Sequence, residues 1–211
     1  MAAFQALTTG GIWALADTQP LFDRATKLNE KAIPAAHPRN AECLNNQAEC
    51  YRLQGKPAAA EPVAKQASAV AEKALGADHP LTAECLTTLG LALVDQSKYA
   101  DAEPLLTRSL GIAEKKLGSA HPNVGRCLYA KAELYRRQEK YNDAEPLAKR
   151  SLAIREKILQ PDHPELADSL SSYAAILQKL NRAAEANKLD DRAKAIRAKY
   201  PQPTANDRPG K

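Results

Sequence analysis

The four histidines and four cysteines are the residues of this sequence best suited to metal binding or nucleophilic chemistry. Each histidine precedes a proline, at His37, His79, His121 and His163, and the spacing is 42 residues each time (79 − 37, 121 − 79, 163 − 121). Zinc ligands must lie about 2 Å from one ion, and residues one repeat apart in a stacked array cannot converge on one ion. We therefore expect structural histidines, no metal or other cofactor, and no enzyme activity.

The cysteines also follow the repeat. Cys43, Cys85 and Cys127 are 42 residues apart, and Cys50 lies two helical turns after Cys43. Stacking would separate the three repeat-related residues by about 10 Å or more, whereas a disulfide requires Cα atoms within about 7 Å. We expect buried or half-buried thiols, which favour a reducing compartment and a cytoplasmic location. The sequence also has no phosphate-binding glycine loop, His-Glu-x-x-His motif or Gly-x-Ser-x-Gly motif.

Other landmarks keep the same period, and a fixed period of this length is typical of stacked repeats. Pro20, Pro62, Pro104 and Pro146 are 42 residues apart. We predict a degenerate or partial N-terminal repeat, four units of which the last ends in a polar capping helix, and a disordered tail. In that order they occupy residues 1–36, 37–78, 79–120, 121–162, 163–200 and 201–211.

Each unit is predicted to contain two helices joined by a short turn. In the first unit, His37 is placed to cap a helix whose first position is Pro38, where proline is favoured. A turn follows at residues 54–56, and Gly76 stands where a second helix would end. Two columns hold small residues, which would let the paired helices approach closely: Ala48, Gly90, Ala132, Ala174 and Ala60, Ala102, Ala144, Ala186. Neither helix could bury its apolar stripe alone, so stacking would build the core.

These units resemble tetratricopeptide repeats, in the 42-residue version found in kinesin light chains. The resemblance is carried by HPNVGRCLYAKAELYRRQEKYNDAEPLAKRSLAIREKIL and KYADAEPLLTRSLGIAEKKLG, and it covers residues 37–199 and part of 17–36. It implies an all-α fold, a right-handed superhelical solenoid of antiparallel helix pairs. It also implies a concave groove, lined by the first helices, that holds an extended peptide or a partner helix.

Helical spacing then selects the residues on the face of each first helix that points away from its partner helix. Their arginines predict a cationic groove, and because arginine pairs with carboxylates through two parallel bonds, an acidic segment is the expected partner. The candidate partner-binding residues are Asn45, Asn46, Glu49, Arg52, Thr88, Leu91, Arg126, Tyr129, Glu133, Arg136, Arg137, Ser172 and Lys179.

The favoured function is a non-enzymatic scaffold or adaptor that binds another protein, and two alternatives stay open. An isoelectric point near 9.0 permits nucleic-acid binding, although an aromatic content of 5% offers few platforms for base stacking. A structural or oligomerisation module is the other alternative, with a monomer or a weak homo-oligomer formed through the N-terminal edge near Trp13. No membrane span is expected, because no apolar run approaches about 20 residues. A secretory signal is not expected either, because the first 20 residues have no basic leader before their weak apolar stretch.

Overall fold

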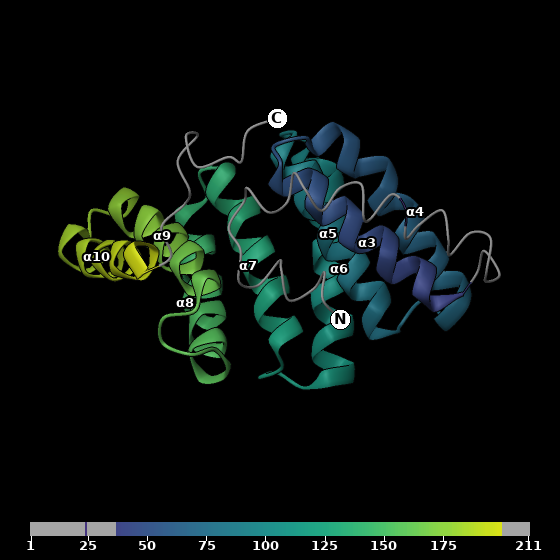
Figure 1. The fold of residues 1–211 in the computed structure, drawn as a ribbon. Helices are drawn as coiled ribbons and strands as arrows, with labels where there is room; N and C mark the ends of the chain where they lie inside the picture. The colour runs from purple at the N-terminus through teal and green to yellow at the C-terminus, as the bar shows by residue number, and fades with distance from the viewer. Residues whose placement is uncertain (1–23, 25–36, 200–211) are drawn as a thin grey trace, which may run out of the picture.

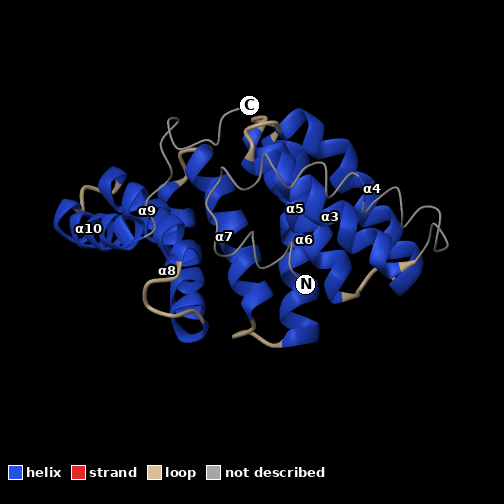
Figure 2. Cartoon of the chain, viewed as in Figure 1, coloured by secondary structure: helices blue, strands red, loops and turns tan. Residues whose placement is uncertain are grey.

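The computed structural model describes Arg24 and residues 37–199, so the predictions for residues 1–36 and for the tail at 201–211 lie outside the described residues. Between residues 37 and 199 the chain forms eight helices and no strand (Figures 1 and 2). In chain order they are α3 (Pro38–Leu53), α4 (Pro57–Leu75), α5 (Pro80–Asp95), α6 (Tyr99–Leu117), α7 (Pro122–Arg137), α8 (Tyr141–Ile158), α9 (Pro164–Lys179) and α10 (Ala183–Lys199).

The histidines have the predicted structural role. Each is the N-cap of a first helix, and its Nδ1 atom accepts a hydrogen bond from the backbone N–H two residues later. The distances are 3.2 Å at His37, 3.1 Å at His79, 3.2 Å at His121 and 3.3 Å at His163. The ring satisfies one of the N–H groups that a helix start leaves without a partner. The proline that follows occupies a position where no N–H is needed.

The predicted turns are also present, and they share a left-handed residue. Gly55 has φ 71° in the first unit, and the corresponding Ser97, Glu139 and Asn181 have φ between 60° and 62°. Three non-glycine residues therefore adopt a conformation that glycine adopts at lower cost. Among the second helices, α4 ends at Leu75, and its C-cap Gly76 has φ 95°, as the predicted role of this glycine requires.

The helices pack as antiparallel pairs that form a right-handed superhelical solenoid. Within each pair the helices lie side by side, from α3 with α4 to α9 with α10 (Figure 1). The first helices of successive units also contact one another, α3 with α5, α5 with α7 and α7 with α9, whereas the backbones of the described second helices lie farther apart. This asymmetry brings the first helices closer together and curves the stack toward them. We call the surface formed by α3, α5, α7 and α9 the inner face.

The small-residue columns form the contacts within the pairs. Ala48, Ala132 and Ala174 are fully buried, and so are all four alanines of the second column. At Gly90 an added Cβ atom would lie 2.4 Å from Cδ2 of Leu106. Leu106 is fully buried where α4 and α8 have Ala64 and Ala148. The unit at 79–120 thus combines a glycine with a leucine where its neighbours combine two alanines.

A repeated ion pair links successive second helices. We call the surface formed by these helices, α4, α6, α8 and α10, the outer face. Arg108 lies 2.9 Å from Glu72, Arg150 lies 2.7 Å from Glu114, and Arg192 pairs with Glu156. Each arginine reaches the preceding second helix, and both columns advance by 42 residues. These side chains are largely exposed, so each pair stabilises the fold by about 1 kcal/mol or less. The arginines of these pairs lie away from the inner face, so their replacement serves below as a control for a loss of charge.

Candidate partner-binding face

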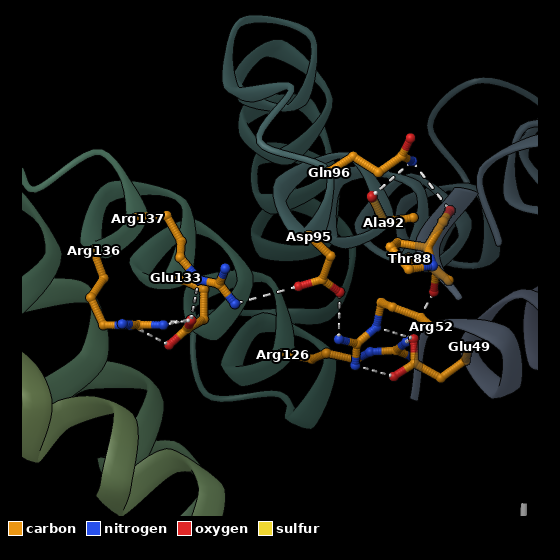
Figure 3. A network of polar contacts seen from close by, with 11 residues as sticks. Glu49, Arg52, Thr88, Ala92, Asp95, Gln96, Arg126, Glu133, Arg136 and Arg137 are labelled. Atoms are coloured by element: carbon orange, nitrogen blue, oxygen red, sulfur yellow. Dashed lines mark hydrogen bonds and ion pairs between the residues drawn. The ribbon is translucent and has the colours of Figure 1, made fainter. Parts of the chain in front are cut away.

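A network of charged side chains connects three first helices on the inner face. It consists of Glu49 and Arg52 from α3, Glu84 and Asp95 from α5, and Arg126, Glu133, Arg136 and Arg137 from α7. We call these eight residues the inner-face network, and Figure 3 shows how most of them converge.

One branch of the network joins the C-terminal parts of the three helices. The Arg52 guanidinium lies 2.9 Å from a Glu49 carboxylate oxygen and 3.2 Å from Asp95. On its other side, Asp95 lies 3.7 Å from Arg137 (Figure 3). Asp95 is therefore shared by two arginines from the units before and after its own, and it links three successive units.

A second branch joins the three helices through Arg126. Its guanidinium lies 3.2 Å from Glu84 and 3.5 Å from Glu49, and it donates a hydrogen bond of 2.9 Å to the Thr88 hydroxyl. Glu49 is consequently shared by Arg52 and Arg126. The two branches meet at this carboxylate, so the position of each arginine depends on the others.

Electrostatics at Glu49 show how strongly this branch is coupled. Burial by itself would raise the pKa of the Glu49 carboxyl, but the charges of Arg52 and Arg126 outweigh burial and lower the pKa to about 2. Burial would lower the pKa of Arg52, and its carboxylate partners Glu49 and Asp95 instead raise it. Both groups stay charged, because the opposite charge of each offsets the cost of burying the other.

The third part of the network lies on α7, around a buried carboxylate. Glu133 is 8% exposed, accepts hydrogen bonds from Nε and Nη2 of Arg136, and also accepts one from the Ser172 hydroxyl of α9. The hydrogen bonds to Glu133 raise the pKa of Arg136. Arg137 is held more weakly, at 4.0 Å from Glu133, and 42% of its side chain is exposed. Arg137 is thus the arginine of the network that is most available to a partner.

The structure distributes the predicted site residues between the surface and the interior. Asn45, Thr88 and Leu91 are 2%, 0% and 4% exposed, so a partner could not touch them in this arrangement. They are covered because the first helices contact one another. Asn46 and Tyr129 are half-buried. The remaining residues of the predicted set that are partly or fully exposed are Glu49, Arg52, Arg126, Arg136, Arg137, Ser172 and Lys179.

The charge of the face differs from the cationic groove that the sequence predicted. The four arginines of the network are matched by four carboxylates, and each arginine has a carboxylate oxygen within 4.0 Å. The prediction missed Glu84 and Asp95. A signal for both exists in the sequence, because Glu84 is 42 residues before Arg126 and Asp95 is 42 residues before Arg137. Opposite charges at one repeat position on adjacent units are placed to pair.

The surroundings of the cysteines and of the other possible metal ligands can be compared with the sequence predictions. No cluster of three His, Cys, Asp or Glu residues suited to a metal ion occurs among residues 37–199. None of the four cysteines forms a disulfide bond; Cys43 is half-buried and the others are buried. Burial raises the pKa of the Cys85 thiol to about 12, so this thiol stays protonated and is a poor nucleophile. Within the described part of the chain, no helix has the length and apolar character of a membrane span.

Several solved structures share this fold. A protein of Podosopora anserina described as a kinesin light chain with nearly identical TPR-like repeats is 24% identical, with a TM-score of 0.62; the match covers 89% of this chain and 88% of that one. BtubC (BKLC) from P. vanneervenii is 18% identical, with a TM-score of 0.67 and coverage of 93% and 78%. A Rap protein complexed with Competence and Sporulation Factor is 20% identical, with a TM-score of 0.72 and coverage of 90% and 49%.

The sequence was also compared with curated proteins and with family models. No curated protein was found to match it. The model of the tetratricopeptide repeat, however, matches residues 41–115, 92–157 and 126–199, which together span the helices from α3 to α10. Four His-capped helix pairs, stacked with their first helices in contact, agree with that match. The chain therefore belongs to the tetratricopeptide repeat family, and it has the solenoid fold of the kinesin light chain-like proteins.

Proposed function

We propose that this chain is a non-enzymatic scaffold that holds a polypeptide segment of a partner protein along its inner face. The observation that carries the proposal is the inner-face network, in which charged side chains from α3, α5 and α7 are fixed relative to one another by shared ion pairs. A face with such preorganised groups loses little side-chain entropy when it binds a partner. The Rap protein of the same fold was solved with Competence and Sporulation Factor bound, which supports a binding role for the fold.

The partner segment is proposed to be acidic and to bind toward the α7–α9 end of the face. Residues 121–162 contain nine Lys and Arg residues and six Asp and Glu residues, a net charge of +3 (9 − 6). Most inner-face arginines already have carboxylate partners, so a simple cationic groove does not explain a preference for acid. Arg137, whose ion pairs are 3.7 Å and 4.0 Å long, and the exposed Lys179 are the cations through which a partner carboxylate can enter.

The test compares the binding of length-matched acidic and basic peptide pools to the wild-type protein and to two double variants. Arg137→Ala/Lys179→Ala removes two inner-face cations and leaves the Arg136–Glu133 pair in place. Arg108→Ala/Arg150→Ala removes the same charge from the outer face and is the matched control. We expect the acidic pool to bind more tightly, and the inner-face variant to lose about tenfold in affinity, as two partly exposed charge contacts would.

Equal binding of the two pools would refute the preference for acidic segments. Equal losses in the two variants would refute the assignment of the inner face, because only long-range charge would then matter. The four cysteines form no disulfide, which fits a reducing environment, and we propose that the scaffold works in the cytoplasm. Fractionation of cells that express the full protein would test that location.

A further inference from the structure

Arg155 stands at a repeat position that is apolar in the first two units. The residues 42 and 84 positions earlier are Ala113 and Ala71, and both are fully buried. Arg155 itself is half-buried, at the last turn of α8. A second helix thus carries a large cation where its predecessors pack an alanine methyl group into the core.

The side chain of Arg155 leaves α8 and reaches the junction between α7 and α9. Its Nη1 atom donates a hydrogen bond of 2.7 Å to the Ser169 hydroxyl and lies 3.4 Å from the Glu165 backbone carbonyl. The centre of its guanidinium lies 4.9 Å from the centroid of the Tyr129 ring, a distance suited to a cation–π interaction. Neighbours from α7 and α9 therefore fix the guanidinium in place.

Arg155 differs from the arginines of the inner-face network in its charge compensation. No carboxylate oxygen lies within 4.0 Å of its guanidinium among residues 37–199. Burial consequently lowers the pKa of Arg155, whereas the carboxylate partners of Arg52 raise that of Arg52. The Arg155 charge is thus partly desolvated. Its contact partners are a hydroxyl, a carbonyl and a ring, and the charges of Glu165 and Asp168 act on it only from beyond ion-pair distance.

The unused part of the guanidinium has a definite geometry. Both hydrogen bonds of Arg155 involve Nη1, which leaves Nε and Nη2 without a hydrogen-bond acceptor in the described structure. These two nitrogens form one edge of the guanidinium, and two parallel N–H groups on one edge match the two oxygens of a carboxylate. Tyr129 and Ser169 already hold the group in position, so little side-chain entropy remains to be lost on binding.

We propose that the free edge of Arg155 binds a carboxylate of the acidic partner segment and anchors that segment between α7 and α9. This inference rests on the proposed function and adds the residue that gives it specificity for acid. Arg155 is better suited to this role than the network arginines, because a ligand carboxylate need not displace an internal one.

The first experiment measures the affinity of the selected acidic peptides for Arg155→Ala. Alanine is the residue that the first two units carry at this position, so the variant is expected to fold. Arg197→Ala is the matched control, since Arg197 stands 42 residues later and is paired with Asp168 at 3.1 Å. We expect Arg155→Ala to lose tenfold or more in affinity, as for a lost charge-assisted bidentate contact, and Arg197→Ala to lose less than twofold. Similar losses in the two variants would overturn the inference.

The second experiment needs no partner polypeptide. The arginine Nε–Hε signals of the wild-type protein are followed by NMR during titration with N-acetyl-aspartate amide, and the signal missing in Arg155→Ala identifies Arg155. We expect this signal to shift in a saturable way, while the Arg150 signal on the outer face stays in place. A flat Arg155 signal overturns the inference even if acidic peptides bind. A shifting signal in a protein that binds no peptide overturns the proposed function and leaves the carboxylate site standing.

Discussion

Gly90 and Leu106 form a compensated pair, and a double-mutant cycle tests this directly. A methyl group added at Gly90 would lie 2.4 Å from Cδ2 and 2.6 Å from Cγ of Leu106, which is fully buried and cannot move into solvent. Such overpacking costs about 1–3 kcal/mol. Replacing a helical glycine with alanine returns about 0.5–1 kcal/mol. Gly90→Ala alone is therefore expected to destabilise the protein by about 0–2.5 kcal/mol, the difference between these terms.

The other two corners of the cycle follow from the neighbouring units. Leu106→Ala removes a fully buried leucine from a cluster that includes Ala64 and Leu134, and it should cost about 2–5 kcal/mol. The double variant recreates the alanine pair of the first unit, Ala48 with Ala64. The added methyl group then meets space in place of Leu106, so the double variant should be no less stable than Leu106→Ala alone.

The measurement is urea unfolding of the four proteins, followed by circular dichroism and fitted with a common m-value. The expected coupling between the two substitutions is about 1–3 kcal/mol, equal to the overpacking that the leucine deletion relieves. Additive effects, with the double variant as destabilised as the sum of the single ones, would refute the reasoning. A single Gly90→Ala variant more stable than the wild type would refute it as well.

Three further predictions concern caps, carboxylates and thiols. His121→Ala should lower the free energy of unfolding by about 0.5–2 kcal/mol through loss of the N-cap. His121→Asn should keep most of the stabilisation that the N-cap contributes, as urea unfolding will show. Because the pKa of Glu49 falls from 4.5 to about 2 on folding, its ion pairs stabilise the protein above pH 4.5 and lose that contribution as pH falls through 2. Between pH 4.5 and 2, the free energy of unfolding should therefore decrease less steeply for Glu49→Gln than for the wild type, as urea unfolding at each pH will show. Because burial raises the pKa of Cys85 and of Cys127, both thiols should react with a thiol reagent at pH 8 at least tenfold more slowly in the native than in the urea-unfolded protein, and peptide mapping of the labelled protein would reveal any faster reaction.

The sequence determined the local structure of this protein because its signals are local. The His-Pro steps set the starts of the first helices, since the histidine caps and the proline fits the first turn, and all four appear where predicted. The 42-residue period fixed how many helix pairs occur between residues 37 and 199 and which columns are small. The same spacing keeps the repeat-related cysteines too far apart to form disulfides, and none is formed.

Only the tertiary structure decided which charges remain available on the inner face. Helical spacing placed Arg52 and Arg126 on one face, but it could not show that Asp95 and Glu84 of α5 pair with them. Thr88 was predicted to meet a partner and is fully buried, because the first helices contact one another across units.

Arg155 is a residue that the prediction from helical spacing left out. Its place on a second helix excluded it from a prediction based on first helices, yet its long side chain reaches the α7–α9 junction. Periodicity fixes where a backbone lies and which way a Cβ atom points. The pairing and reach of long charged side chains depend on distances between units, and those distances are set by how closely the helices pack.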